Sequence, residues 1–136
     1  MRDLFNIRME QETLDAMSSL ALAHVGDAVY ELLVRTKLSL DGRATSGNLH
    51  RETVSHVNAP AQSKAAAIIL PLLDEQEADV FRRGRNTNVH FVPKKATRAE
   101  YQQATALEAL FGWLYLTGRH DRINSLFSAI IESEEK

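Results

Sequence analysis

Residues 19–35 read SLALAHVGDAVYELLVR, a pattern that predicts a long and mostly apolar helix. Two residues in the middle of this stretch are unusual for such a helix. A glycine inside a helix costs about 1 kcal/mol relative to alanine, and a buried carboxylate needs a cation, a hydrogen-bond network or a metal beside it. Because Gly26 has no side chain, a second helix can cross closely and bring its own groups to Asp27.

A second helix of the same design follows later, where residues 106–116 read ALEALFGWLYL. It carries one acid, Glu108, and one glycine, Gly112. If the two helices cross, Asp27 and Glu108 meet in a small polar site that suits a hard divalent cation such as Mg²⁺, with water completing its coordination shell. Such a cation polarises a phosphoryl oxygen and supplies hydroxide for attack on a phosphodiester. The alternative is that each acid pairs with a basic or amide neighbour on the surface, and the spacing alone favours neither interpretation.

The composition limits the class of protein. The 136 residues are 44% hydrophobic and 25% charged, which is typical of a single soluble domain over residues 1–136. The sequence contains no apolar run of membrane-spanning length and does not start like a signal peptide, so we expect a cytoplasmic protein without a membrane partner. With no cysteine in the chain, carboxylates and histidines are the only likely metal ligands.

Helical periodicity and capping residues predict an all-α, single-domain helical bundle, because no stretch alternates like a strand. The expected helices run from Ser18 or Ser19 to about Lys37, onward from Ser46, from Asn58 to Pro71, from Asp74 to a closing Gly84, from Thr97 to Thr117, and from Asp121. We expect the acidic tail, residues 132–136, to be frayed.

The basic residues are distributed unevenly. The net charge is −2, yet six basic residues and no acid lie between Val80 and Ala99. These residues form a predicted basic loop, 82–98, before the second acidic helix, and they could neutralise phosphates along an RNA groove, with Asn86 reaching 2′-hydroxyls. The alternative is an ordinary solvated loop, but the absence of any acid favours RNA binding. The basic residues are Arg82, Arg83, Arg85, Lys94, Lys95 and Arg98.

Two of these stretches resemble a known family. Residues 23–29, AHVGDAV, resemble the signature helix of the ribonuclease III catalytic domain, and residues 107–112, LEALFG, resemble its second acidic helix. The order and separation of the two motifs also match. The short length and the segment FRRGRN, residues 81–86, resemble the short branch of the family, which carries no appended double-stranded RNA-binding domain.

The resemblance implies an all-α endoribonuclease domain that forms a homodimer and cleaves double-stranded RNA with Mg²⁺. In the short branch the implied substrate is precursor 23S ribosomal RNA of the large subunit, with room for assistance by a ribosomal protein. Asp27 matches the catalytic aspartate of the family and Glu108 its metal-binding glutamate, so we expect both to serve catalysis and metal binding. Larger members carry further acids where this chain has Leu20, Ala23 and Thr105, and we therefore expect fewer direct metal ligands.

Three questions remain open at this stage. Glu31 lies one turn after Asp27 and could join the site, although its spacing favours an ion pair with Arg35. The apolar residues around the Asp27 helix suit either the core or a two-fold dimer face. A non-catalytic helical module that binds structured RNA or a protein partner is the rival function, and the missing acids are its main support.

Overall fold

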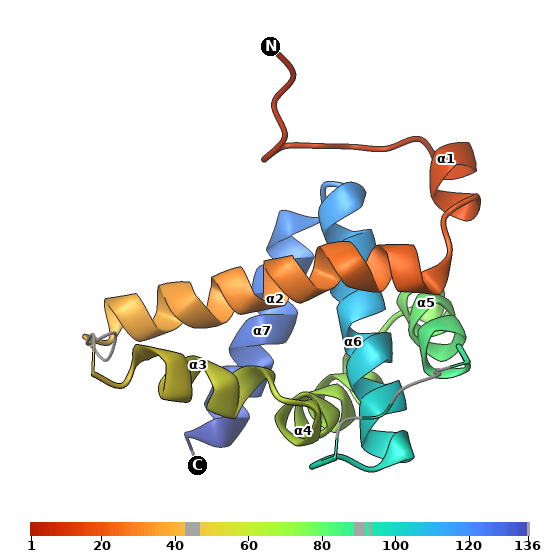
Figure 1. The fold of residues 1–136 in the computed structure, drawn as a ribbon. Coiled ribbons are helices and arrows are strands. Elements are labelled where there is room, and N and C mark those ends of the chain that lie inside the picture. The colour runs from red at the N-terminus through yellow and green to blue at the C-terminus, as the bar shows by residue number, and fades with distance from the viewer. Residues whose placement is uncertain (43–46, 89–91, 93, 136) are drawn as a thin grey trace.

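The computed structural model describes residues 1–42, 47–88, 92 and 94–135, and within these residues all regular secondary structure is helical (Figure 1). The predicted all-α class is thereby confirmed. The elements are α1 (Gln11–Asp15), α2 (Ser19–Leu40), α3 (Leu49–Val57), α4 (Ala59–Ile69), a 3₁₀ turn (Leu70–Leu72), α5 (Glu75–Arg85), α6 (Arg98–Leu116) and α7 (His120–Glu134). No described helix has both the length and the apolar character needed to cross a membrane.

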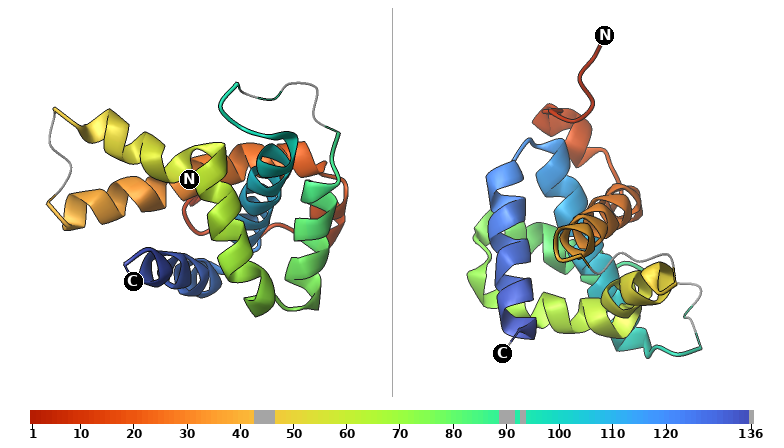
Figure 2. Two further views of the ribbon diagram at one scale, coloured as in Figure 1. Left: turned by 90° about the horizontal axis from the view of Figure 1, so that it is seen from below. Right: turned by 90° about the vertical axis from the view of Figure 1, so that its left-hand side faces the viewer.

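Helix α6 is the centre of the fold. Figure 2 shows it surrounded by α2, α4, α5 and α7, and eleven of its residues are buried. A helix that is apolar on every side belongs in a core, and α6 has this character from Ala104 onward, apart from Glu108. Tyr30 from α2 packs edge to face against Phe111 on α6 at 5.3 Å between ring centroids and against Phe127 on α7 at 5.6 Å. These aromatic side chains join three helices in one core.

Side-chain caps begin the helices largely where the sequence predicts them. Ser18 accepts the backbone N–H of Ala21, and Asn58 accepts that of Ala61. Two helices open with reciprocal capping boxes, made by Asp74 with Glu77 and by Thr97 with Glu100, and each box satisfies two backbone donors that would otherwise lack partners. The predicted cap Ser46 lies outside the described residues, and α3 begins after Asn48.

Gly84 has a different role from the one predicted. Helix α5 does not close at Gly84 but continues to Arg85, with Asn86 at its C-terminal cap position. Gly84 is buried, and a Cβ added to it would lie 3.0 Å from Cα of Ala106 and 3.1 Å from Cβ of Ala109 on α6. The glycine therefore serves close packing of two helices rather than the end of one.

The described part of the acidic tail begins inside a helix, because α7 runs to Glu134. Two side chains of this end approach other helices: Glu134 lies 3.4 Å from Nδ1 of His56 and Glu135 lies 3.9 Å from Nζ of Lys37. The fraying of residues 132–136 expected from the sequence stays a prediction. Helix α2 extends beyond its predicted end at Lys37 and finishes at Leu40.

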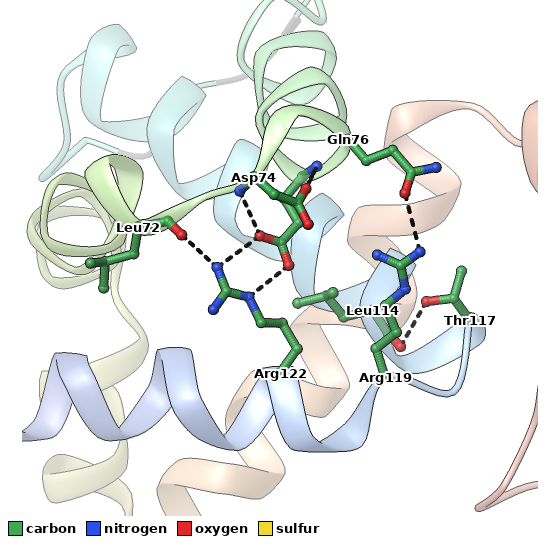
Figure 3. A network of polar contacts seen from close by, with 8 residues as sticks. Leu72, Asp74, Gln76, Leu114, Thr117, Arg119 and Arg122 are labelled. Carbon is green, nitrogen blue, oxygen red and sulfur yellow. Dashed lines mark hydrogen bonds and ion pairs between the residues drawn. The ribbon is translucent and has the colours of Figure 1, made fainter.

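An ion pair between the buried Glu77 and the partly exposed Arg122 joins α5 to α7 (Figure 3). Glu77 is fully buried, and its carboxylate accepts hydrogen bonds from Nε of Arg122 at 2.8 Å and from Nη2 at 2.9 Å. The same guanidinium donates to the carbonyl of Leu72. Nearby, Arg119 donates to the side chain of Gln76 at 3.1 Å. Because Glu77 also closes the capping box of α5, this network fixes where α5 begins relative to α7.

Candidate active site

The two glycine-containing helices cross with their backbones in contact. A Cβ added to Gly26 would lie 1.6 Å from the carbonyl oxygen of Glu108 and 2.7 Å from the backbone nitrogen of Gly112. A Cβ added to Gly112 would lie 2.0 Å from the carbonyl oxygen of Leu22. Real Cβ atoms do not approach other atoms this closely, so only glycine fits at either position. The crossing of α2 and α6 predicted from the two glycines is therefore confirmed.

The crossing brings the side chains of Asp27 and Glu108 close enough together for Asp27 to raise the pKa of Glu108. Asp27 is exposed, while Glu108 is half-buried. Burial raises the pKa of Glu108 to about 8, with further increases from Asp27 and an opposing effect from Gln62. The unfavourable proximity of two carboxylates is the kind of arrangement that a bound cation relieves.

The raised pKa of Glu108 predicts a pH-dependent stability in the absence of metal. An ordinary glutamate loses its proton near 4.5, whereas Glu108 in the folded protein keeps it to about 8. The folded state therefore binds more protons than the unfolded state between these values, so the stabilising contribution is full below about pH 4.5 and is lost as the pH rises through about 8. In chelator, we expect the melting temperature to fall from pH 5 to pH 8.5, and Glu108→Gln to fall less over the same range. Equal pH dependence in the two proteins would contradict this account.

The carboxylates fit a small hard cation. Mg²⁺ is commonly held by one or two carboxylates while water and substrate phosphates supply its other ligands. In the described part of the chain, no group of three or more histidine and acidic side chains could hold a metal ion. None of the three positions that lack an acid supplies a third carboxylate: Leu20 is exposed, Ala23 is buried in the core, and the hydroxyl of Thr105 donates to the carbonyl of Tyr101. Asp27 and Glu108 would therefore be the protein ligands.

One residue beside the pair was missing from the sequence-based prediction. Gln62 on α4 has 2% of its surface exposed, and its Nε2 donates to Oε2 of Glu108 at 3.5 Å. A signal was present in the sequence, because Gln62 precedes the buried residues Ala66 and Ile69 by four and seven positions. A polar residue in such a buried stripe requires a partner, but the sequence alone does not identify Glu108 as that partner.

Glu31 forms an ion pair with Arg35 and does not join Asp27 and Glu108. Its carboxylate lies 2.8 Å from Nη2 of Arg35, one turn further along α2. The ion pair favoured by the sequence spacing is thereby confirmed. Glu31 also provides an acid on the same helix as Asp27 whose removal can serve as a control.

The basic residues lie on three parts of the fold. Three belong to the last turn of α5, one to the first turn of α6, and two to the connection between these helices, part of which (residues 89–91 and 93) lies outside the described residues. The predicted basic loop 82–98 is thus helical at both ends. The three on α5 are Arg82, Arg83 and Arg85, the connection holds Lys94 and Lys95, and α6 begins with Arg98.

Asp79 on α5 reduces the free positive charge of this surface, and the sequence-based prediction left it out because it lies one residue before the acid-free window. Both Arg82 and Arg83 pair with it, the latter at 3.1 Å. Arg85 is half-buried, and Asn86 is exposed at the end of the helix. The packing of Gly84 against Ala106 brings this basic end of α5 to the part of α6 that carries Glu108.

Comparison with known proteins identifies the class. Residues 20–119 match the family model described as "Ribonuclease III domain", a range that includes both acidic helices and the basic segment. The chain belongs to the ribonuclease III family and is an endoribonuclease. A crystal structure of a protein from Fusobacterium nucleatum has the same fold, with a TM-score of 0.79 and 33% identity over 89% of this chain and 97% of that one.

Curated relatives place the chain among the short members of the family. "Mini-ribonuclease 3" of Symbiobacterium thermophilum is 43% identical over 86% of this chain and 90% of its own length. The protein of the same name from Gloeobacter violaceus is 45% identical over 85% and 83%, respectively, and that from a Thermoanaerobacter species is 38% identical over 94% and 90%. The resemblance to the short branch is thereby confirmed.

Membership in the family decides one question left open by the sequence. The rival interpretation, a non-catalytic helical module, is not supported, because the family is one of RNA-cleaving enzymes. Ribonucleases III are generally metal-dependent, act on double-stranded RNA and are typically dimeric. These properties of the family direct attention to the carboxylate pair and to the basic surface.

Proposed function

We propose that this protein, acting as one ribonuclease III-like catalytic domain over residues 1–136, hydrolyses phosphodiester bonds in double-stranded RNA with Mg²⁺ held by Asp27 and Glu108. The observation that carries the proposal is the meeting of these two carboxylates at a crossing where the backbones of α2 and α6 touch. Rigid helices hold a site more accurately than loops do. The carboxylates are therefore fixed in place before any ligand arrives.

The two carboxylates have different tasks in this proposal. Asp27, on the exposed side, is accessible to a hydrated cation and to the phosphate of the substrate. Glu108 holds the cation from the buried side and must lose its proton to do so, which becomes easier as the pH approaches its raised pKa of about 8. A bound Mg²⁺ ion supplies polarisation of the phosphodiester and activation of the attacking water.

The direct test of this function is cleavage of a long double-stranded RNA by the purified protein with Mg²⁺ and with chelator. We expect fragments in Mg²⁺ and none in chelator, while RNA binding persists in both, because basic side chains rather than the cation supply most of the attraction to phosphate. Gel electrophoresis and a binding titration under the same salt conditions measure the two properties. Cleavage that continues in chelator would contradict the role of the metal.

The basic surface defined by Arg82, Arg83, Arg85, Asn86, Lys94, Lys95 and Arg98 is the proposed RNA-binding surface. All of these side chains except Arg85 are exposed, and Arg85 is half-buried. Their charge is the sign that phosphate requires, and the contact between Gly84 and Ala106 brings α5 close to the acidic helix. A surface of this kind binds backbone phosphates largely without regard to sequence.

Replacing Arg83 and Arg85 with alanine tests the RNA-binding surface. We expect weaker RNA binding and a shallower dependence of affinity on salt, by about one unit of the log–log slope for each phosphate that the variant no longer neutralises. Asp79→Asn is the matched control, and its expected effect on RNA affinity is the opposite one. It removes the acid that pairs with both Arg82 and Arg83, so RNA binding should become tighter. An unchanged slope in the double variant would exclude these arginines from the RNA-binding surface.

The natural substrate and assembly follow from the resemblance to the short branch. We propose that the RNA is precursor 23S ribosomal RNA, that the protein works in the cytoplasm with room for a helping ribosomal protein, and that it forms a homodimer. The exposed side of α2 supports the last point, since Val25, Ala28, Val29 and Leu32 line an apolar groove with Phe5. A two-fold dimer would present two sites to the two strands of one duplex.

A further inference from the structure

The burial of the Gln62 side-chain amide is energetically unfavourable. It lies on α4 with 2% of its surface exposed, next to Ala65 and Ala66 with 1% each and Ile69 with none. Burying an amide without adequate hydrogen bonds is unfavourable, and an apolar side chain of similar volume would pack at this position without that penalty. The fold alone therefore gives no reason for a glutamine here.

The partner of Gln62 supplies a reason. Its Nε2 donates to Oε2 of Glu108 at 3.5 Å, so the carboxylate has Asp27 as one neighbour and Gln62 as another. These three side chains come from three different helices, α2, α4 and α6. A donor on a carboxylate oxygen stabilises the negative charge and limits rotation of the group, and an amide does so without adding a third negative charge.

We propose that Gln62 is a positioning residue that holds the carboxylate of Glu108 toward Asp27 in readiness for a divalent cation. The inference rests on the proposed metal site and assigns the support of that site to a helix outside the two that carry the acids. Residues that hydrogen-bond to metal ligands orient them, and their loss typically weakens metal binding or activity by about 10- to 100-fold. Gln62 takes that place here, where few acids surround the pair.

The test is the binding of Mn²⁺ alone, measured by calorimetry on folded variants without RNA. Gln62→Leu keeps the packing and removes the donor, and we expect its Mn²⁺ affinity to fall by about tenfold. The matched control is Gln103→Leu on α6, because the side-chain carbonyl of Gln103 is buried without a hydrogen-bond partner and this change leaves the hydrogen bond to Glu108 in place. Wild-type affinity in Gln62→Leu, or an equal loss in Gln103→Leu, would overturn the proposal.

A second variant keeps the proposal testable if Gln62→Leu fails to fold. Gln62→Glu has nearly the same shape but places a third carboxylate beside Glu108. We expect its melting temperature to drop in chelator and to rise with Mn²⁺ by more than that of the wild type, because a cation that binds only the folded state stabilises it. If Mn²⁺ shifts both proteins equally, Gln62 does not face the metal site and the proposal is wrong.

The proposed function and this inference fail in distinguishable ways. If Asp27→Asn and Glu108→Gln both bind Mn²⁺ as the wild type does, the proposed metal site itself is wrong. If these two variants lose Mn²⁺ binding and Gln62→Leu does not, the site stands and only the role of Gln62 falls.

Discussion

Asp27→Asn should severely slow RNA cleavage while leaving the protein folded and able to bind RNA. The change replaces an exposed carboxylate with an amide of the same shape and removes the negative charge that Glu108 faces. We expect the rate to fall by about a hundred- to a thousandfold, the scale typical of removing one group that stabilises transition-state charge. Above the raised pKa of Glu108, about 8, both carboxylates are charged and repel each other without a cation, so the melting temperature of the variant in chelator should stay the same or rise there.

Glu31→Gln is the matched control for this experiment. It removes an acid from the same helix one turn away, and that acid is paired with Arg35 on the surface. Such surface pairs contribute roughly 0–1 kcal/mol, so cleavage and stability should remain near those of the wild type. Single-turnover cleavage, an RNA-binding titration and thermal unfolding on each variant separate the outcomes. Comparable cleavage by Asp27→Asn and the wild type would remove Asp27 from the catalytic site.

Gly26→Ala should destabilise the protein severely. The added methyl group would lie 1.6 Å from the carbonyl oxygen of Glu108, a backbone atom that cannot rotate away. The two central helices must then separate, which exceeds the usual overpacking cost of about 1–3 kcal/mol. We expect a loss of more than about 3 kcal/mol, despite a gain of about 1 kcal/mol from helix propensity. Proteins of this size are stable by only about 5–15 kcal/mol, so this loss would remove a large part of the total free energy of unfolding.

Other glycines provide a graded comparison for the measurement by chemical denaturation. Gly112→Ala meets a backbone oxygen at 2.0 Å and should behave like Gly26→Ala, whereas Gly84→Ala meets its nearest neighbour at 3.0 Å and should cost much less. Among the described residues beyond its chain neighbours, no atom lies within 4 Å of a Cβ added to Gly47, so Gly47→Ala should be nearly neutral. If Gly26→Ala proves as stable as Gly47→Ala, the helices do not cross as described.

The sequence suggested the crossing and the pair of acids without deciding between a shared site and separate surface pairs, because the suggestion rested on a rare residue type inside each apolar helix. Each of the two apolar helices contains one acid and one glycine among apolar neighbours. These residues are Gly26 and Asp27 on one helix, and Glu108 and Gly112 on the other. The caps at Ser18 and Asp74 were equally predictable, because a capping residue acts within four positions of itself. Features whose causes are local in sequence were thus within reach of sequence reasoning.

Features that depend on contacts between residues distant in sequence could not be predicted from the sequence alone. Gln62 and Glu108 are 46 positions apart, and nothing in the sequence of α4 says which helix it will face. Gly84 is predicted to end a helix because glycine is common there, whereas its neighbour is Ala106 on another helix. The contacts of Glu134 with His56 and of Glu135 with Lys37 were likewise beyond sequence reasoning, because these partners lie far back in the chain.

The backbone contact between α2 and α6 couples the loss of enzyme activity on heating to the unfolding of the whole protein. The carboxylate pair has no loop or hinge of its own, so nothing in the described contact lets the site loosen while the rest of the protein stays intact. Heat or denaturant that separates the two acids also opens the core around Phe111 and Tyr30. Inactivation by heat should therefore follow the same curve as global unfolding, without the earlier, local loss of activity that is characteristic of enzymes whose catalytic groups lie on mobile loops.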